Sequence, residues 1–305
     1  MIELHAHDCT AWIDPARGGS CTRLSRYGAE ALRTPTGAES YQESPFLWGT
    51  PLLFFPNRIS QGRFVFEGRT YAFSVNEPAT GCFLHGTLHQ TPFEVTGRNE
   101  SAVALRYVAT PQAPYLSFPH AFTLELFWRL AEDGLHQRAV FTNDSSQNMP
   151  VALAFHTTFR CPFIPDSQPE DLRLTLDTSL EYSRDMRTYL PDGGCSANYT
   201  GKEEMAAGTL IPCEHTLSRL FRMGERREML LTDGRAGLRV RYQAGNTYGY
   251  WMLYNGGSRN YLCVEPQSWL SNCPNAPFPR EQTGFDFIAP GHSRTYETCL
   301  CIEKV

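Results

Sequence analysis

Several features of membrane, nucleic-acid-binding and disulfide-rich proteins are absent from this sequence. No apolar stretch approaches the roughly 20 residues that a transmembrane helix needs. No run of Lys or Arg stands out and the net charge is −5, so we expect neither a nucleic-acid partner nor a membrane-surface partner. The ten cysteines contain no CxxC pair, and we therefore expect free, buried thiols.

Signs of export and of a modular chain are missing as well. The N-terminal "MIELHAHDCTAW" has no basic segment followed by an apolar run, so we expect no signal peptide and a cytoplasmic location. No composition break resembles a linker, and no segment repeats with a fixed period. Hydrophobic residues make up 41% of the 305 residues, which allows a sizeable core. We predict a single domain over residues 1–305, and the sequence leaves open whether it forms a homodimer.

Long amphipathic helical patterns are also lacking, and short alternating runs take their place. Residues 63–66 and 70–75 alternate apolar and polar side chains on either side of Glu67-Gly68, which predicts a β-hairpin. The turns at Asp133-Gly134 and at 233–237 lie between similar runs. We therefore predict hairpins at these positions as well.

The C-terminal third continues the pattern. "YGYWMLYN" and "YLCVE" predict a strand pair, and Pro290-Gly291 predicts a last hairpin. The segment "PEDLRLTL" near Pro169 fits either a helical turn or a strand. Regular hairpins with 24 Gly and 21 Pro indicate a sandwich or barrel. The predicted fold is all-β, with one large antiparallel domain.

Two groups of residues raise the question of a metal. "LHAHD" would place His5 and His7 on one face of a strand, as in some metal-dependent hydrolases. Those enzymes need alternating strands and helices, which this chain lacks, so an exposed N-terminal strand is the favoured interpretation. Cys299 and Cys301 would share one side of a strand, but no second close pair accompanies them. We expect buried structural cysteines here and no metal site.

Polar residues interrupt apolar runs at three places. Asn57 and Arg58 follow "LLFFP", His85 follows "CFL", and His156 follows "VALAF". An Arg guanidinium offers planar, multi-donor contacts that suit vicinal hydroxyls or an anionic group. A histidine at a strand end is either a hydrogen-bonded core residue or an acid or base facing a pocket.

A fourth interruption is "YLCVEPQSW", where Glu265 follows a buried strand. An unpaired buried carboxylate costs several kcal/mol, so Glu265 must be paired, hydrogen-bonded or at a wet pocket. Pro266 cannot donate to a sheet, and we expect it to end the strand. Gln267, Ser268 and Trp269 then provide polar groups and an aromatic face, which are typical of a sugar site.

The order of these motifs resembles the aldose 1-epimerase (galactose mutarotase-like) family. The resemblance rests on "PLLFFPNRISQGRFVFEGRTY", then "LHG", then "FHTTF" and finally "CVEPQS". It implies a β-supersandwich and the interconversion of α and β anomers of a free aldose such as glucose or galactose, in carbohydrate metabolism. Such chemistry requires neither a metal nor a redox cofactor.

The resemblance also implies roles for individual residues. Glu265 matches the catalytic base, His156 the general acid and His85 the second active-site histidine. Arg58 matches the substrate-binding arginine. The family's substrate-binding Asp has no counterpart, because Ser218 stands at that position. The neighbours Asn57 and Gln267 are further candidates for binding the monosaccharide.

Two alternatives remain open on the same fold. Arg58, Arg63 and Arg160 could gather a phosphate, which would favour an epimerase of a hexose 6-phosphate. The missing Asp favours a carbohydrate-binding protein without catalysis. Measured rates on glucose and on glucose 6-phosphate would distinguish all three.

Overall fold

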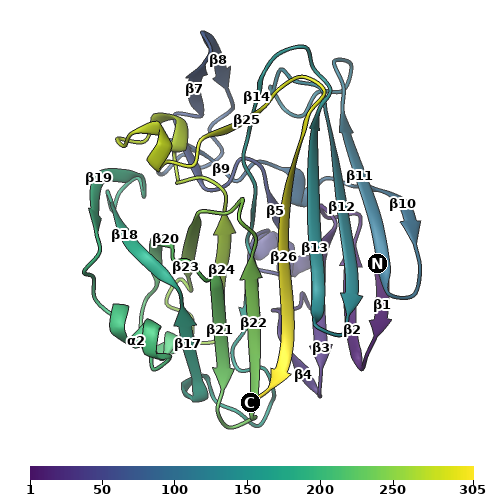
Figure 1. Cartoon of the computed structure of the whole chain (residues 1–305), viewed down its shortest axis with the longest axis vertical. Coiled ribbons are helices and arrows are strands. Elements are labelled where there is room, and N and C mark those ends of the chain that lie inside the picture. Colours follow the sequence, from purple (N-terminus) through teal and green to yellow (C-terminus); the bar gives the residue numbers. More distant parts are fainter.

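Alternating apolar residues form a long antiparallel sheet, sheet 1, across the face of the computed structural model in Figure 1. The structure describes the backbone of residues 1–305 and all side chains except those at positions 38, 39 and 43. Buried and partly exposed residues alternate along its strands, so one face of the sheet packs on the core. In spatial order, sheet 1 contains β10 (Glu94–Arg98), β11 (Ala102–Ala109), β12 (Phe122–Ala131), β13 (Gly134–Asn143), β26 (Ser293–Lys304), β22 (Leu238–Ala244), β21 (Glu228–Asp233) and β17 (Leu172–Leu176).

A second antiparallel sheet, sheet 2, packs against the buried face of sheet 1. One of its central strands is buried along almost its whole length, which explains the near-continuous apolar run in "YLCV". In spatial order, sheet 2 contains β19 (Pro191–Ser196), β18 (Thr178–Arg184), β20 (Ser218–Met223), β23 (Tyr250–Tyr254), β24 (Tyr261–Gln267), β15 (Ala154–Phe155) and β5 (Leu52–Leu53), and β16 (Thr158–Arg160) also pairs with β24.

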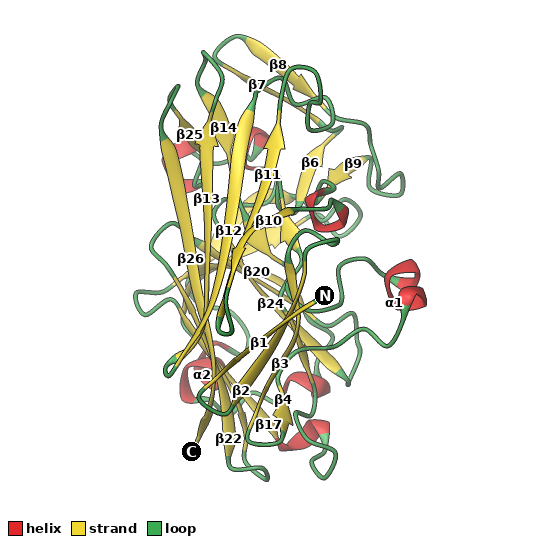
Figure 2. Cartoon of the chain, turned by 90° about the vertical axis from the view of Figure 1, so that its right-hand side faces the viewer, coloured by secondary structure: helices red, strands yellow, loops and turns green.

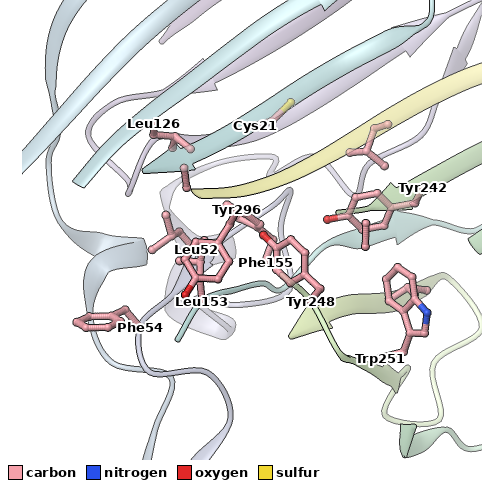
Figure 3. Close-up of a cluster of buried hydrophobic side chains, with 14 of the residues drawn as sticks. Cys21, Leu52, Phe54, Leu126, Leu153, Phe155, Tyr242, Tyr248, Trp251 and Tyr296 are labelled. Atoms are coloured by element: carbon pink, nitrogen blue, oxygen red, sulfur yellow. The ribbon is translucent and has the colours of Figure 1, made fainter. Parts of the chain in front are cut away.

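Large aromatic side chains fill the space between the two sheets. Figure 3 shows Tyr242 and Tyr296 from sheet 1 close to Phe155 and Trp251 from sheet 2. All four side chains are buried. Burying one such side chain contributes on the order of 2 kcal/mol to folding. This packing joins sheet 2 to sheet 1.

Smaller sheets and short helices complete the molecule, and α1 projects from the strands in Figure 2. No helix in the described part of the chain is both long enough and apolar enough to cross a membrane. The small sheets are β1 (Ile2–Ala6), β2 (Cys9–Asp14), β3 (Ser20–Arg26) with β4 (Ala29–Glu30); β6 (Arg58–Ser60) with β9 (Cys82–Leu84); β7 (Arg63–Phe66) with β8 (Arg69–Ala72); and β14 (Met149–Val151) with β25 (Asp286–Ile288). The helices are α1 (Ala38–Glu43) and α2 (Lys202–Ala207), with 3₁₀ turns η1 (Leu88–Gln90), η2 (Pro169–Asp171), η3 (Pro212–Glu214), η4 (Cys273–Asn275) and η5 (Arg280–Gln282).

Most of the predicted hairpins are confirmed. Strands β7 and β8 pair with Phe64 opposite Tyr71, and their rings stack with centroids 4.6 Å apart. The pairs β12–β13, β21–β22 and β23–β24 also form as predicted. The ambiguous segment near Pro169 contains both forms, the turn η2 followed by the strand β17.

The predicted hairpin at Pro290-Gly291 is wrong. The chain turns there, but β25 and β26 do not pair with each other. Strand β25 pairs with β14, whereas β26 lies between β13 and β22 in sheet 1. Both edges of β26 are therefore occupied, and local alternation alone could not reveal this long-range pairing.

The prediction that Pro266 ends its strand is also wrong. Strand β24 continues to Gln267, and Pro266 pairs with Trp251 of β23. On the other side of β24, the N–H groups of Val264 and Ser268 donate to Thr157 and Leu153. The ring nitrogen of Pro266 falls between these bonds, where the neighbouring strand is interrupted between β15 and β16. The missing N–H therefore costs no hydrogen bond at this point.

Candidate active site

A cavity of about 550 Å³ opens where β24 passes the gap between β15 and β16. Residues that are far apart in the sequence meet in it, including all three predicted catalytic residues. Sheet 2 provides its floor, and loops that follow β9, β15 and β18 form its walls. The residues that carry the chemistry or shape of the cavity are Phe46, Asn57, Arg58, Glu77, His85, His156, Met186, Tyr189, Ser218, Arg219, Met252, Tyr254 and Glu265.

Glu265 and His156 meet at the floor of this cavity. Oε1 of Glu265 lies 3.2 Å from Nε2 of His156, and both side chains are almost completely buried. The other carboxylate oxygen, Oε2, accepts a hydrogen bond of 3.1 Å from Nε2 of Gln267. The amide fixes the plane of the carboxylate, so one oxygen is left to face the imidazole and the cavity.

Burial shifts the pKa values of this pair in opposite directions. Desolvation raises the pKa of Glu265 to about 8, although Gln267, Arg58 and Arg184 oppose the shift. Desolvation also lowers the pKa of His156 to about 3. Both shifts favour a neutral group, so at neutral pH the pair holds one proton, on the carboxyl group, beside a neutral imidazole.

His156 occupies the interruption in sheet 2. It follows β15 directly, and its backbone N–H donates to the carbonyl of Pro51 at 2.8 Å. Its second ring nitrogen, Nδ1, has no hydrogen-bond partner among the described residues. Glu265 is therefore the group that compensates the charge of a protonated His156.

His85 approaches the same pair from the loop after β9. Its ring lies edge-on to that of His156, with centroids 5.4 Å apart. The backbone N–H of Asn57 donates to Nδ1 of His85 at 3.1 Å. Burial lowers the pKa of His85 well below its ordinary value, and the neighbouring His156 and Arg58 add to this effect. The neutral ring therefore carries its proton on Nε2, which leaves a hydrogen-bond donor for a ligand.

The backbone around His85 depends on Gly86. Both residues have a positive φ, 61° and 66° respectively. A Cβ atom on Gly86 would collide with the carbonyl oxygen of Phe54 and the hydroxyl of Tyr115. Glycine is required here because the turn presses the backbone against its neighbours.

Arg58 lies in the cavity wall and is already paired. Its Nε and Nη2 atoms donate to the two carboxylate oxygens of Glu77 at 2.6 and 2.7 Å. Its guanidinium carbon also lies 4.9 Å from the centre of the Tyr189 ring. The fork of Arg58 is thus held in one orientation, with Nη1 outside the pair with Glu77.

The other two predicted binding residues differ in their position. Asn57 lines the cavity, and its Oδ1 accepts a hydrogen bond of 3.0 Å from Ser271. Gln267 does not line the cavity, because it lies behind Glu265 and donates to it. Its contact orients the carboxylate, and binding of a sugar by Gln267 stays a prediction.

Other residues that the sequence singled out lie outside the cavity. Trp269 is fully buried and stacks on Phe55 with centroids 4.8 Å apart, so it belongs to the core. Ser268 hydrogen-bonds the backbone of Leu153. At the N-terminus, His5 is exposed on β1 and His7 is exposed in the turn that follows it.

Ser218, which stands where the family has its substrate-binding Asp, is paired with an arginine. Ser218 lines the cavity at the start of β20, and the guanidinium of Arg184 donates to its carbonyl and hydroxyl oxygens. Burial lowers the pKa of Arg184 to about 10, and Arg58 contributes to the same shift. Sequence reasoning missed both Arg184 and Glu77, because neither follows an apolar strand end.

Comparisons with known proteins identify the family. The family model of aldose 1-epimerases matches residues 3–301. The chain is similar to a galactose mutarotase-like protein from Clostridium acetobutylicum, with 27% identity and a TM-score of 0.93 over 99% of this chain and 95% of that one.

Two further solved structures share the fold. A galactose 1-epimerase from Lactobacillus acidophilus has 14% identity and a TM-score of 0.76, with 99% of this chain and 93% of that one covered. A GalM/aldose epimerase homologue from C. elegans has 17% identity and a TM-score of 0.79, covering 100% and 98%. The predicted sandwich of antiparallel sheets is confirmed. Since the family match spans nearly the whole sequence, the chain belongs to the aldose 1-epimerase family.

Proposed function

We propose that this protein is an aldose 1-epimerase that interconverts the α and β anomers of a free aldose such as glucose or galactose. The observation that carries this proposal is the 3.2 Å contact between Glu265 and His156 at the floor of the cavity. Family membership supports epimerase activity in general. The substrate and the residue roles are part of the proposal.

The contact suits the chemistry of a hemiacetal. The C1 hydroxyl and the ring oxygen are bonded to the same carbon, so the groups that exchange protons with them must also lie close together. Glu265 and His156 meet this requirement from one side of the cavity. Two proton transfers by positioned side chains each contribute roughly 10²–10⁴-fold to the rate.

The single proton of the pair is sufficient for a full cycle. The proton first moves across the contact from Glu265 to His156. Glu265, now a carboxylate, then takes the C1 hydroxyl proton, while the imidazolium of His156 gives its proton to the ring oxygen. The ring C–O bond then breaks, and a free aldehyde forms. The pair is left as a carboxylic acid beside a neutral imidazole, which is the form that burial favours.

Ring closure on the other face of C1 completes epimerisation. Rotation about C1–C2 presents the opposite carbonyl face, and the two protons return by the reverse path. His85 donates a hydrogen bond from Nε2 to the sugar, and Arg58 binds hydroxyls with the part of its fork that Glu77 leaves free. Tyr189 and Met186 provide apolar contacts near the mouth of the cavity.

Polarimetry on freshly dissolved α-D-glucose and α-D-galactose tests the proposal. The wild-type chain should accelerate the approach to the equilibrium rotation for at least one sugar, and Glu265→Gln should remove the acceleration. A wild-type chain that binds a sugar but leaves its mutarotation at the uncatalysed rate would support the carbohydrate-binding alternative instead.

The hexose 6-phosphate alternative has less support. Of the three arginines on which it rested, Arg58 lines the cavity but is paired with Glu77. Arg160 lies near Glu30, and Arg63 belongs to the β7–β8 hairpin. A higher kcat/KM on glucose 6-phosphate than on glucose would reverse this preference.

A further inference from the structure

Three side chains of metal-ligand type gather on the outer side of sheet 1, outside the cavity that contains Glu265. Asp133, His136 and Cys299 present ligand atoms that all lie within 4.8 Å of one another. Nε2 of His136 is 2.7 Å from Oδ1 of Asp133 and 3.9 Å from Sγ of Cys299. One imidazole nitrogen therefore faces both a carboxylate and a thiol.

The sheet register brings these residues together. His136 on β13 is directly opposite Cys299 on β26, and such cross-strand pairs share one face with Cβ atoms about 5 Å apart. Figure 1 shows the two strands side by side. Asp133 lies in the turn between β12 and β13, and its carboxylate reaches the ring of His136, three residues later. The cluster thus joins a hairpin turn to the C-terminal strand.

The geometry does not suit a catalytic thiol. A Cys–His–Asp triad needs the two ring nitrogens of the histidine, one for the thiol and one for the carboxylate. Here Nε2 makes both contacts.

The same geometry suits a borderline-soft divalent cation. Zn²⁺ binds thiolate, imidazole and carboxylate at about 2.0–2.3 Å in a tetrahedron, which places the ligand atoms a few ångströms apart. A thiolate and a carboxylate would balance the ion's two charges, so the nearby Arg129 and Arg241 meet no net positive charge. His136 and Cys299 also line a groove of about 720 Å³, which leaves room for a water molecule as the fourth ligand.

We infer that Asp133, His136 and Cys299 form a zinc-binding site that fastens the β12–β13 turn to β26. Binding of the ion releases the thiol proton of Cys299 to solvent. The ring proton of His136 moves to Nδ1, so that Nε2 binds the ion in place of its direct hydrogen bond with Asp133. The site is independent of the proposed epimerase chemistry, because none of its ligands lines the cavity with Glu265.

Titration of the reduced, chelator-treated full chain with Co²⁺ and Zn²⁺ tests the inference. We expect one Co²⁺ per chain, with the near-ultraviolet charge-transfer absorption of a cobalt thiolate, and displacement of Co²⁺ by Zn²⁺. Cys299→Ser should lose the absorption, and Asp133→Asn should weaken Zn²⁺ binding by at least about tenfold. Zn²⁺ should raise the melting temperature of the wild type but not of Cys299→Ser.

Two variants are matched controls. Cys195→Ser removes an exposed thiol elsewhere, and His5→Asn breaks another exposed His–carboxylate pair, with Glu3. Both should retain the cobalt absorption. If Cys299→Ser does not fold, His136→Asn provides the same comparison. The inference fails if the wild type shows no thiolate absorption, or if Cys299→Ser or its substitute retains it.

Discussion

Oε1 of Glu265 lies 3.2 Å from Nε2 of His156, in a setting where burial favours the neutral form of both groups. The pair can therefore move one proton between its members without creating an isolated buried charge. Ring opening of a sugar needs a base and an acid at the same moment. In the proposed mechanism the contact supplies both.

Replacing Glu265 with Gln should abolish anomer interconversion and leave sugar binding largely intact. The amide keeps the shape of the side chain but cannot take the C1 hydroxyl proton. We expect kcat to fall by about 10²–10⁴-fold, measured by polarimetry. Binding should be checked by calorimetry with the same sugar. A variant with near-normal rates would refute the assignment of the base.

Replacing His156 with Ala should be nearly as damaging, because the ring oxygen then loses its proton donor. A rate loss of at least about 10²-fold is expected in the same assay. His89→Ala is a useful control, because His89 is a buried histidine whose ring lies 4.6 Å from Phe46. If His156→Ala retains more than a tenth of the activity, the acid is another residue, and His85 is the first candidate.

The rate should fall on the alkaline side of about pH 8. The proposed cycle needs one proton on the pair, and the raised pKa of Glu265 sets the pH at which that proton is lost. After subtraction of the uncatalysed rate, kcat/KM should fall about tenfold per pH unit above this limit. A profile that stays level to pH 10 would mean that the pair is not the proton carrier.

Ionisation of Glu265 should lower the free energy of unfolding at high pH. Its carboxyl pKa is about 8 in the fold and near the ordinary 4.5 when unfolded. Between these values the folded chain binds a proton that the unfolded chain has released, so the free energy of unfolding falls as pH rises. Glu265→Gln does not titrate, and it should be more stable than wild type at pH 9 by up to about 5 kcal/mol.

Urea unfolding at pH 9 and at pH 4 measures this difference. The advantage of Glu265→Gln should shrink at pH 4, where both states of the wild type hold the proton. An equal advantage at both pH values would show that packing, and not the carboxylate charge, is responsible.

Removing the carboxylate of Glu77 should loosen Arg58. Glu77→Gln replaces the two charged oxygens that Arg58 contacts with one neutral amide oxygen, so the guanidinium group loses its two-point, charge-assisted contact and its fixed orientation. We expect KM to rise about tenfold with a smaller change in kcat, since hydrogen bonds to charged groups are worth roughly 1.5–3 kcal/mol. Glu94→Gln, which breaks the exposed pair with Arg106, is the matched control. A fall in kcat alone would assign Glu77 a different role.

Sequence patterns predicted the site residues that stand out from their immediate neighbours in the chain. Glu265, His156 and His85 each follow an apolar run, and polar groups at such positions need a partner or a pocket. The contact of Gln267 with Glu265 could also have been predicted from the sequence, because residues two apart in a strand share a face. The sequence favours sugar binding by Gln267 instead, because an amide and an aromatic face beside a carboxylate are typical of a sugar site.

The remaining contacts join distant segments, so local patterns could not reveal them. Arg58 meets Glu77 across 19 residues, and Arg184 meets Ser218 across 34. The cluster of Cys299 with His136 depends on β26 entering sheet 1 beside β13. The same long-range pairing made the predicted C-terminal hairpin wrong, because alternation shows that a strand exists but not which strand it pairs with.

Pro266 in β24 keeps the cavity open by preventing backbone pairing across the gap. Unpaired N–H and C=O groups beside a gap in a sheet can hydrogen-bond to another strand, from the same chain or from a second one. Pro266 offers no N–H on the side of the gap between β15 and β16. Backbone pairing along this side of β24 therefore stays interrupted at His156. The cavity that a substrate must enter is thus kept free of an added strand.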